Sequence, residues 1–270
     1  MNRQGKGKIE YLDFTWNPVT GCLHNCPYCY ARKITNRFGG ASETHYNETV
    51  GEECQWYTEE TKETHDLLEP IYDVDRGHNA PYPFYFDPTF HRYRLDEPQK
   101  VKKSSIIGTV YMGDLFGDWV LDEWIEEVFK ACEKAPWHKY LFLTKNPGRY
   151  YDLYCKKLIP CKNNYWFGTT LTKPSDEYVW LEKAPYKTFV SMEPLLEGFG
   201  ELEKGFMHGQ IPKWVIIGQQ TGPNKPPKNE WVQSIIDQCR AAGVPVFVKS
   251  PLYEKFPVHE WPEGLEVSGC

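Results

Sequence analysis

The chain has 270 residues, of which 40% are hydrophobic and 16% aromatic, so it can bury a substantial core. Its formal net charge of -6 argues against a general attraction to nucleic acid or to an anionic membrane surface. No run of about 18 apolar residues is present, so no membrane-spanning segment is expected. The stretch MNRQGKGKIEYLDF lacks the apolar core of a signal peptide, and we expect a cytoplasmic protein with reduced thiols.

Short apolar runs rich in β-branched and aromatic residues recur along the chain. They predict strands at 10–17, 104–112, 139–144, 164–171, 187–192, 213–218 and 244–249. Apolar residues at helical spacing predict helices at 121–135, 146–158 and 229–242. Strands that alternate with helices indicate an α/β fold in which parallel strands carry the helices on the outside.

Residues 40–104 interrupt this alternation. A full eight-unit barrel usually needs ~250 residues, and only about 205 remain outside the interruption. We therefore predict a single domain over 1–270, built as a partial, open (β/α)6 barrel with an insertion between the first helix and the second strand. The insertion is interpreted either as a solvated surface excursion or as a lid over the barrel mouth, since long loops are often functional.

Polar residues gather where the predicted strands end. In barrels of parallel strands the chemistry takes place at these carboxyl ends. The candidate site residues are Gly113, Asp114, Thr144, Lys145, Ser191, Glu193, Gly218 and Gln219. Some also have a structural interpretation, and Lys145 can simply reach solvent. Asp114 can cap the following turn, Glu193 can form a salt bridge with Lys145 or Lys249, and Gly218 can belong to an ordinary tight turn.

Three cysteines, Cys22, Cys26 and Cys29, follow the first predicted strand with the spacing C-x3-C-x2-C. The odd total of nine cysteines fits a disulfide framework poorly. Three thiolates suit zinc or an iron–sulfur cluster. A structural zinc site needs four ligands, for which His24 is a candidate at an unusual spacing. An iron–sulfur cluster with three cysteines leaves one iron open, where a substrate or cofactor can bind.

The segment from Cys22 to Cys29, with Tyr28 before the last cysteine, resembles the motif of radical S-adenosylmethionine enzymes. The resemblance implies a [4Fe–4S] cluster that cleaves S-adenosyl-L-methionine reductively to a 5′-deoxyadenosyl radical, which abstracts hydrogen from a substrate. It also implies a partial barrel of the radical-SAM type. Gly113 and Asp114 would then meet the cofactor's amino group, and Lys145 its carboxylate. Glu193 would meet a ribose hydroxyl or a substrate amine.

A narrower resemblance covers nearly the whole chain. The segments TWNPVTGC (15–22), MGDLFG (112–117), LFLTKNP (141–147) and SMEPLL (191–196) resemble a family of phage, bacterial and archaeal proteins of unassigned function. That family is usually described as radical-SAM-like. Its GGESG pattern reads GQQTG here at 218–222, so no role of the missing glutamate is carried over.

The sequence thus favours a radical enzyme of unknown substrate, reduced by an electron donor of the flavodoxin or ferredoxin type. A nucleotide or nucleic acid is one candidate substrate. Two alternatives stay open: a zinc- or cluster-stabilised binding protein, and a lyase that reverses a nucleic-acid lesion. The basic aromatic run HRYR (91–94) is interpreted either as a solvated loop or as a contact for an anionic substrate.

Overall fold

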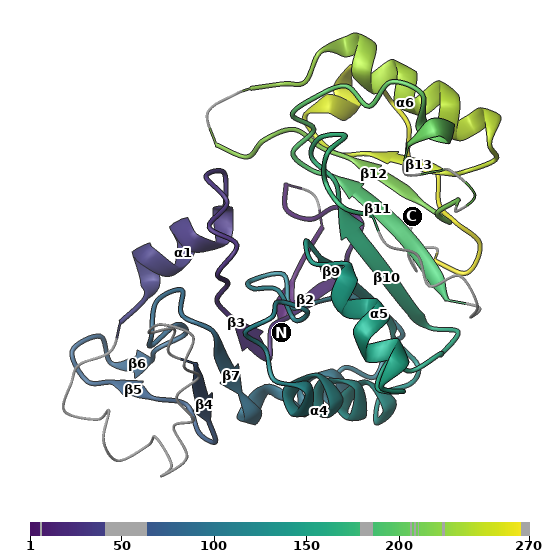
Figure 1. The fold of residues 1–270 in the computed structure, drawn as a ribbon. Coiled ribbons are helices and arrows are strands. Elements are labelled where there is room, and N and C mark those ends of the chain that lie inside the picture. Colours follow the sequence, from purple (N-terminus) through teal and green to yellow (C-terminus); the bar gives the residue numbers. More distant parts are fainter. Residues whose placement is uncertain are drawn as a thin grey trace.

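The computed structural model describes residues 1–5, 7–40, 64–178, 186–205, 207, 209, 211–222 and 225–265. The first part of the predicted insertion, residues 41–63, lies outside this description. The main element of the fold is one large sheet with the strand order β1-β2-β8-β9-β10-β11-β12-β13 (Figure 1). The strands are β1 (Asn2–Arg3), β2 (Phe14–Trp16), β8 (Ile106–Thr109), β9 (Lys139–Thr144), β10 (Tyr165–Thr170), β11 (Lys187–Met192), β12 (Val215–Ile217) and β13 (Val246–Val248).

All ladders from β2 to β13 are parallel, whereas β1 pairs with β2 in the antiparallel sense. Each strand predicted from the sequence is present, and neighbours along the chain are neighbours in the sheet. The prediction of an α/β fold with a large parallel sheet is confirmed. Strand β10 is paired along most of its length on both sides, for example Gly168 with Leu143 of β9 and with Phe189 of β11.

The helices are less regular than a strict repeat of strand and helix. Helix α1 (Tyr30–Phe38) follows the cysteines, and α4 (Asp122–Glu133), α5 (Gly148–Cys155) and α6 (Asn229–Ala241) follow β8, β9 and β12. Within the described residues, the links from β10 to β11 and from β11 to β12 contain no α-helix, only the 3-10 turn Leu202–Lys204. The regular (β/α)6 pattern expected from the sequence is therefore only partly realised. No described helix is long and apolar enough to cross a bilayer.

The sheet is strongly curved. The ring of Tyr11, just before β2, contacts Trp214 and Phe247 with centroid distances of 5.7 and 5.9 Å. In a flat sheet, the five strand steps from β2 to β12 would separate these residues by about 24 Å, at about 4.8 Å per step. Among the described residues β1 and β13 remain edge strands, so a closed barrel is not formed.

Alternation of side chains along each strand explains how the two faces are filled. On one face, Tyr140, Phe142, Tyr165 and Phe167 pack with α4 and α5, and residues of β11 to β13 pack with α6. The intervening residues form a separate core on the concave face: Leu141, Trp166, Phe189, Trp214, Ile216 and Phe247. The concave face is thus filled at its base, and only the strand ends remain available for a site.

The described part of the insertion forms two small sheets beside the cysteine loop (Figure 1). Strands β4 (His65–Leu67) and β7 (Thr89–His91) extend β3 (Val19–Thr20), and β5 (Tyr72–Asp73) pairs with β6 (His78–Asn79). The Arg76 guanidinium donates to the carbonyls of Phe38, Gly39 and Gly40, which end α1. The insertion therefore supports the helix that follows the cysteines. Its action as a lid stays a prediction.

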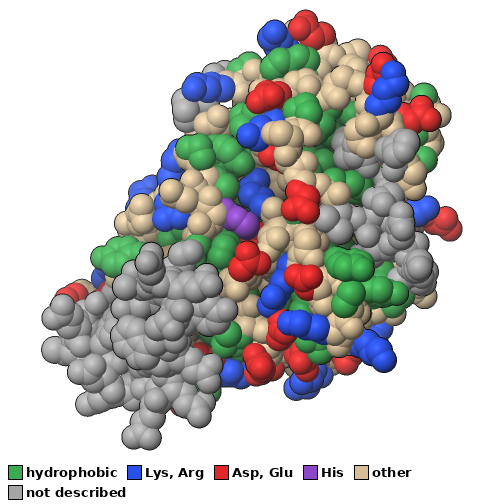
Figure 2. All heavy atoms as spheres, in the orientation of Figure 1, with side chains coloured by type: hydrophobic (Ala, Val, Ile, Leu, Met, Phe, Trp, Pro, Cys, Tyr) green, Lys and Arg blue, Asp and Glu red, His purple; other side chains and the backbone are tan. Residues whose placement is uncertain are grey.

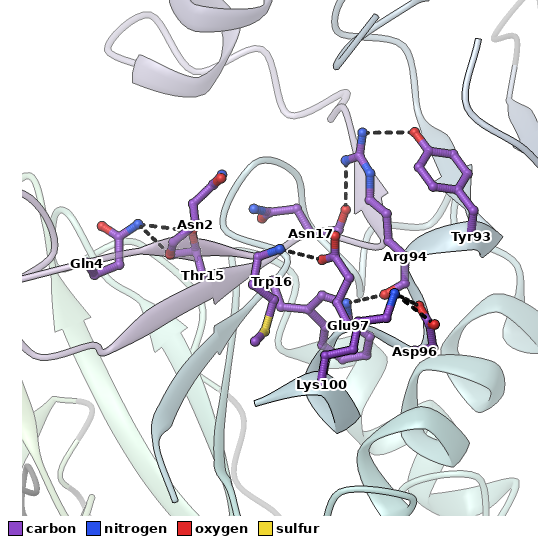
Figure 3. Close-up of polar contacts among 11 residues, drawn as sticks. Asn2, Gln4, Thr15, Trp16, Asn17, Tyr93, Arg94, Asp96, Glu97 and Lys100 are labelled. Carbon is purple, nitrogen blue, oxygen red and sulfur yellow. Dashed lines mark hydrogen bonds and ion pairs between the residues drawn. The ribbon is translucent and has the colours of Figure 1, made fainter. Parts of the chain in front are cut away.

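The basic aromatic run 91–94 is used for internal contacts. His91 is fully buried and lies 2.9 Å from Thr20, and Arg92 pairs with Asp66 and Glu127. Figure 3 shows Arg94 reaching toward Tyr93 and the backbone of Asn17. The short helix α3 (Glu97–Lys100) continues this segment, and Glu97 binds the N-terminal amine at 2.7 Å. The run is therefore not a solvated loop, because these residues attach the insertion to β2 and α4, and its contact with an anionic substrate stays a prediction.

Candidate functional site

The strand ends converge on one cavity of about 690 Å³. A volume of this size lies in the range of small-molecule and cofactor sites. Of the residues predicted for the site, all but Gly218 line it: Cys22, Cys26, Cys29, Gly113, Asp114, Thr144, Lys145, Ser191, Glu193 and Gln219. Tyr82 and Phe86 of the insertion add to its wall. The curved sheet thus brings together side chains that are far apart in the sequence.

The cysteine loop begins at a constrained backbone position. Gly21 has φ +85°, and a Cβ there would lie 2.2 Å from the carbonyl oxygen of Asp87. Its amide donates to the carbonyl of Met112, just beyond β8. At the other end of the loop, Cys29 caps α1, and its Sγ accepts the amide of Arg32 at 3.4 Å. Both ends of the loop are therefore fixed by contacts that the sequence pattern alone does not reveal.

The three thiols share one environment. Burial raises the pKa of Cys22 most, followed by the charge of Asp114 and then by those of Cys26 and Cys29. Within the described residues, no three His, Cys, Asp or Glu side chains stand close enough to hold a metal ion as they are. To bind one group together, the thiol side chains must turn toward each other within the cavity that all three line.

Asp114 occupies the centre of the site and is 4% exposed. Its Oδ2 lies 2.8 Å from Nε2 of His24 and accepts hydrogen bonds from Thr144 Oγ1 at 3.0 Å and the Lys145 amide at 2.9 Å. Its Oδ1 accepts the amide of Phe116. Three of these four contacts fall on Oδ2, and Oδ1 keeps one acceptor site because each carboxylate oxygen has two lone pairs. Asp114 therefore caps the following turn, and its contact with a cofactor amine stays a prediction.

His24 is committed to the same carboxylate. Its ring also packs edge-on against Trp119 at a centroid distance of 4.9 Å. As a fourth zinc ligand beside the cysteines, His24 would have to leave Asp114 or bind through its other ring nitrogen. Binding through the other ring nitrogen would keep the contact with Asp114, as is typical of metal-bound histidines, so the donor set of three thiols and His24 suits zinc as well as a cluster.

Lys145 brings a positive charge into the cavity. Its Nζ lies 5.3 Å from the ring centroid of Tyr28, and burial lowers its pKa. No carboxylate of the described residues lies within ion-pairing distance of this ammonium group, in contrast to Lys249, which pairs with Glu193. A half-buried cation without a carboxylate in direct contact favours an anionic ligand. Lys145 is therefore placed to bind a carboxylate or phosphate.

Glu193 and Lys249 form an ion pair at the ends of β11 and β13. Their side chains are 22% and 12% exposed, and Lys249 also lies over the ring of Tyr11 at 5.8 Å. This is one of the two salt bridges expected as the structural alternative for Glu193. Gly218 does not reach the cavity, because a Cβ there would meet the Glu193 side chain at 2.9 Å. Gly218 is thus the one predicted site residue that does not line the cavity, and its contact with a cofactor stays a prediction.

Tyrosines form part of the cavity wall that sequence reasoning did not assign. Tyr11, Tyr82 and Tyr111 line the cavity, and the Tyr30 hydroxyl donates to the carbonyl of Tyr111 at 2.7 Å. Burial raises the pKa of Tyr111, so its phenol stays protonated. Tyr111 stands only two residues before Gly113, and its position just after β8 was the signal that could have identified it.

The whole chain can now be compared with known proteins. A family described as "Protein of unknown function (DUF5131)" matches residues 6–255, so the protein belongs to this family. This agrees with the expected resemblance to a family of unassigned function. No curated protein matches the chain. Among solved structures, "Spore photoproduct lyase complexed with dinucleoside spore photoproduct" has 12% identity and a TM-score of 0.45, covering 85% of this chain and 74% of that one. So low a score leaves the function to be argued from the site.

Proposed function

We propose that the protein is a radical S-adenosylmethionine enzyme. The observation that carries the proposal is that three thiols and a half-buried lysine, without an ion-pair partner among the described residues, line one cavity at the carboxyl ends of parallel strands. Soft thiolates fit an iron–sulfur cluster by their chemistry, and three of them leave one iron open. A cavity of about 690 Å³ offers room for a second ligand next to them. The residues present therefore fit a [4Fe–4S] cluster with S-adenosyl-L-methionine.

Cys22, Cys26 and Cys29 would hold the cluster. When bound, the two cofactors supply one-electron cleavage of a sulfonium carbon–sulfur bond. The protein's own residues provide binding and orientation: Lys145 pairs with a carboxylate, and Ser191 and Gln219 offer hydrogen bonds at the wall. Asp114 keeps the cysteine loop against the end of β9, which fixes the distance between the thiols and Lys145.

The aromatic wall restricts water at the same place. Tyr11 is 1% exposed, and Met112 and Phe86 are buried beside the cysteines. Exclusion of water protects reactive species from side reactions. The electron is supplied from outside the chain, and a flavodoxin- or ferredoxin-type protein is the proposed class of donor. Figure 2 shows acidic and basic side chains interspersed on the face in view, without a broad basic patch.

The test is anaerobic reconstitution of the full chain with iron and sulfide, followed by S-adenosylmethionine and a strong reductant. We expect 5′-deoxyadenosine by mass spectrometry, and we expect Cys26→Ala to abolish it. Cys161→Ala is the matched control, because Cys161 is an exposed cysteine that does not line the cavity. Iron uptake without cleavage in the wild-type chain, with or without candidate substrates, would contradict the proposal. Binding of zinc alone would favour a binding protein instead.

A further inference from the structure

Arg32 of α1 forms hydrogen bonds with both ends of the cysteine loop. Its Nη2 donates to the carbonyl of Cys22 at 3.2 Å, and its backbone amide donates to Sγ of Cys29 at 3.4 Å. The first and last cysteines of the motif are thus joined through one residue of α1. Lys33, the next residue, is exposed on the same helix and makes neither contact.

The Arg32 side chain is half-buried. It stacks over the ring of Phe86 at 4.6 Å, and its Nε is buried without a hydrogen-bond partner among the described residues. No carboxylate of the described residues pairs with it, whereas Arg92 on the insertion has two. A guanidinium keeps its charge at every accessible pH, and a charge shielded from water acts more strongly on its neighbours. Arg32 therefore places a positive charge, without a carboxylate partner among the described residues, against the backbone of the cysteine loop.

We propose that Arg32 is a positioning residue whose fixed positive charge stabilises the negative charge of the three thiolates and of the cluster they hold. The inference rests on the proposed function. Reduction adds a further negative charge to a cluster, and a nearby cation favours the reduced form. Arg32 thereby raises the reduction potential of the cluster, while its hydrogen bond to Cys22 fixes the loop.

The test compares reconstituted wild-type protein with Arg32→Gln, Arg32→Met, Arg32→Lys and the matched control Lys33→Gln. Iron and sulfide per chain are measured, and the midpoint potential is determined by redox titration followed by electron paramagnetic resonance. In the two neutral variants we expect the ratio of reduced to oxidised cluster at a fixed potential to fall about ten-fold, which corresponds to about 59 mV for one electron. Arg32→Lys should recover most of the potential, and Lys33→Gln should leave it unchanged.

Each outcome decides the inference. Neutral variants that bind the cluster with the potential of Lys33→Gln would overturn it. If the neutral variants bind no cluster, a wild-type potential in Arg32→Lys supports a role of the charge, and an equal loss in Arg32→Lys overturns it. Cleavage of S-adenosylmethionine by the wild-type chain is measured on the same samples. A shifted potential without cleavage removes the radical activity but keeps the inference, and wild-type protein without a cluster overturns both.

Discussion

Nε2 of His24 lies 2.8 Å from Oδ2 of Asp114, and this contact joins the cysteine loop to the ends of two strands. His24 belongs to the loop, whereas Asp114 follows β8 and also accepts the amide of Lys145 after β9. A single buried carboxylate thus sets where the thiols lie relative to the cation of the cavity.

Replacement of Asp114 by alanine removes a buried carboxylate that contacts four groups. These are the His24 ring, the Thr144 hydroxyl and the backbone amides of Phe116 and Lys145. We expect a loss of about 3 kcal/mol in the free energy of unfolding, because a removed partner in a buried ionic network is costly. Urea denaturation of the protein without cofactor measures it. Asp118→Ala is the control. Asp118 is exposed, and within the described structure it accepts only a hydrogen bond from the side-chain amide of Asn146. Its loss should cost about 0.5 kcal/mol. Equal losses in both variants would contradict the central role of Asp114.

Lys145→Met should weaken binding of S-adenosylmethionine at least ten-fold, because the carboxylate loses its counter-charge, and Lys145→Arg should keep part of the affinity. Equilibrium dialysis with the reconstituted protein measures this. Burial lowers the pKa of Lys145 below the usual 10.5, so binding should decline as pH rises through that lowered value. An affinity in Lys145→Met equal to that of the wild type would remove Lys145 from the binding site.

The same lowered pKa has a consequence for stability. Between the folded pKa of Lys145 and 10.5, the unfolded chain holds one more proton at this residue than the native chain. Stability therefore rises with pH in this window, relative to a variant without the amine. We expect the free energy of unfolding of Lys145→Met minus that of the wild type to fall as pH rises toward 10.5, because only the wild type gains stability in this window. Urea denaturation of both proteins at a series of pH values measures this quantity, and a rise with pH would contradict the prediction.

The ion pair between Glu193 and Lys249 should show measurable coupling. A double-mutant cycle with Glu193→Gln and Lys249→Met is expected to give about 1 kcal/mol, because both side chains are largely shielded from water. The coupling should decrease only slightly in 1 M salt, since buried pairs are screened less than exposed ones. The exposed pair of Lys204 and Glu201 provides a comparison, with little coupling expected. A result near zero for Glu193 would mean that this pair contributes nothing to the site's rigidity.

Gly21→Ala should be severely destabilising. The residue has φ +85°, and the added Cβ would lie 2.2 Å from a backbone oxygen that cannot move away easily. We expect a cost of about 3 kcal/mol or more, together with reduced iron uptake, because the cysteine loop starts here. Gly243→Ala is a matched control, since its φ is +70° with nothing within 4 Å of the new Cβ, and it should cost about 1 kcal/mol. Similar values for both would show that the close contact is relieved without cost.

Local patterns sufficed for the elements of the sheet. A continuous apolar run such as KYLFLT (139–144) is typical of a parallel strand that is buried on both faces, so the strand could be predicted without knowledge of distant contacts. The spacing of the cysteines likewise identified the loop and its thiols. The irregular links after β10 and β11 were not foreseen, because the expected repeat assumed a helix after every strand.

The sequence by itself determined which residues stand at the strand ends, because the ends of the short apolar runs mark the strand boundaries. Only the tertiary structure decided their partners: Glu193 pairs with Lys249 rather than Lys145, and Asp114 binds groups of the cysteine loop and of β9. The hydrogen bond from Arg32 to the backbone of Cys22 likewise could not be predicted from the sequence. The physical reason is that the curvature of the sheet sets the distances between strand ends, and this curvature arises from packing across the whole concave face.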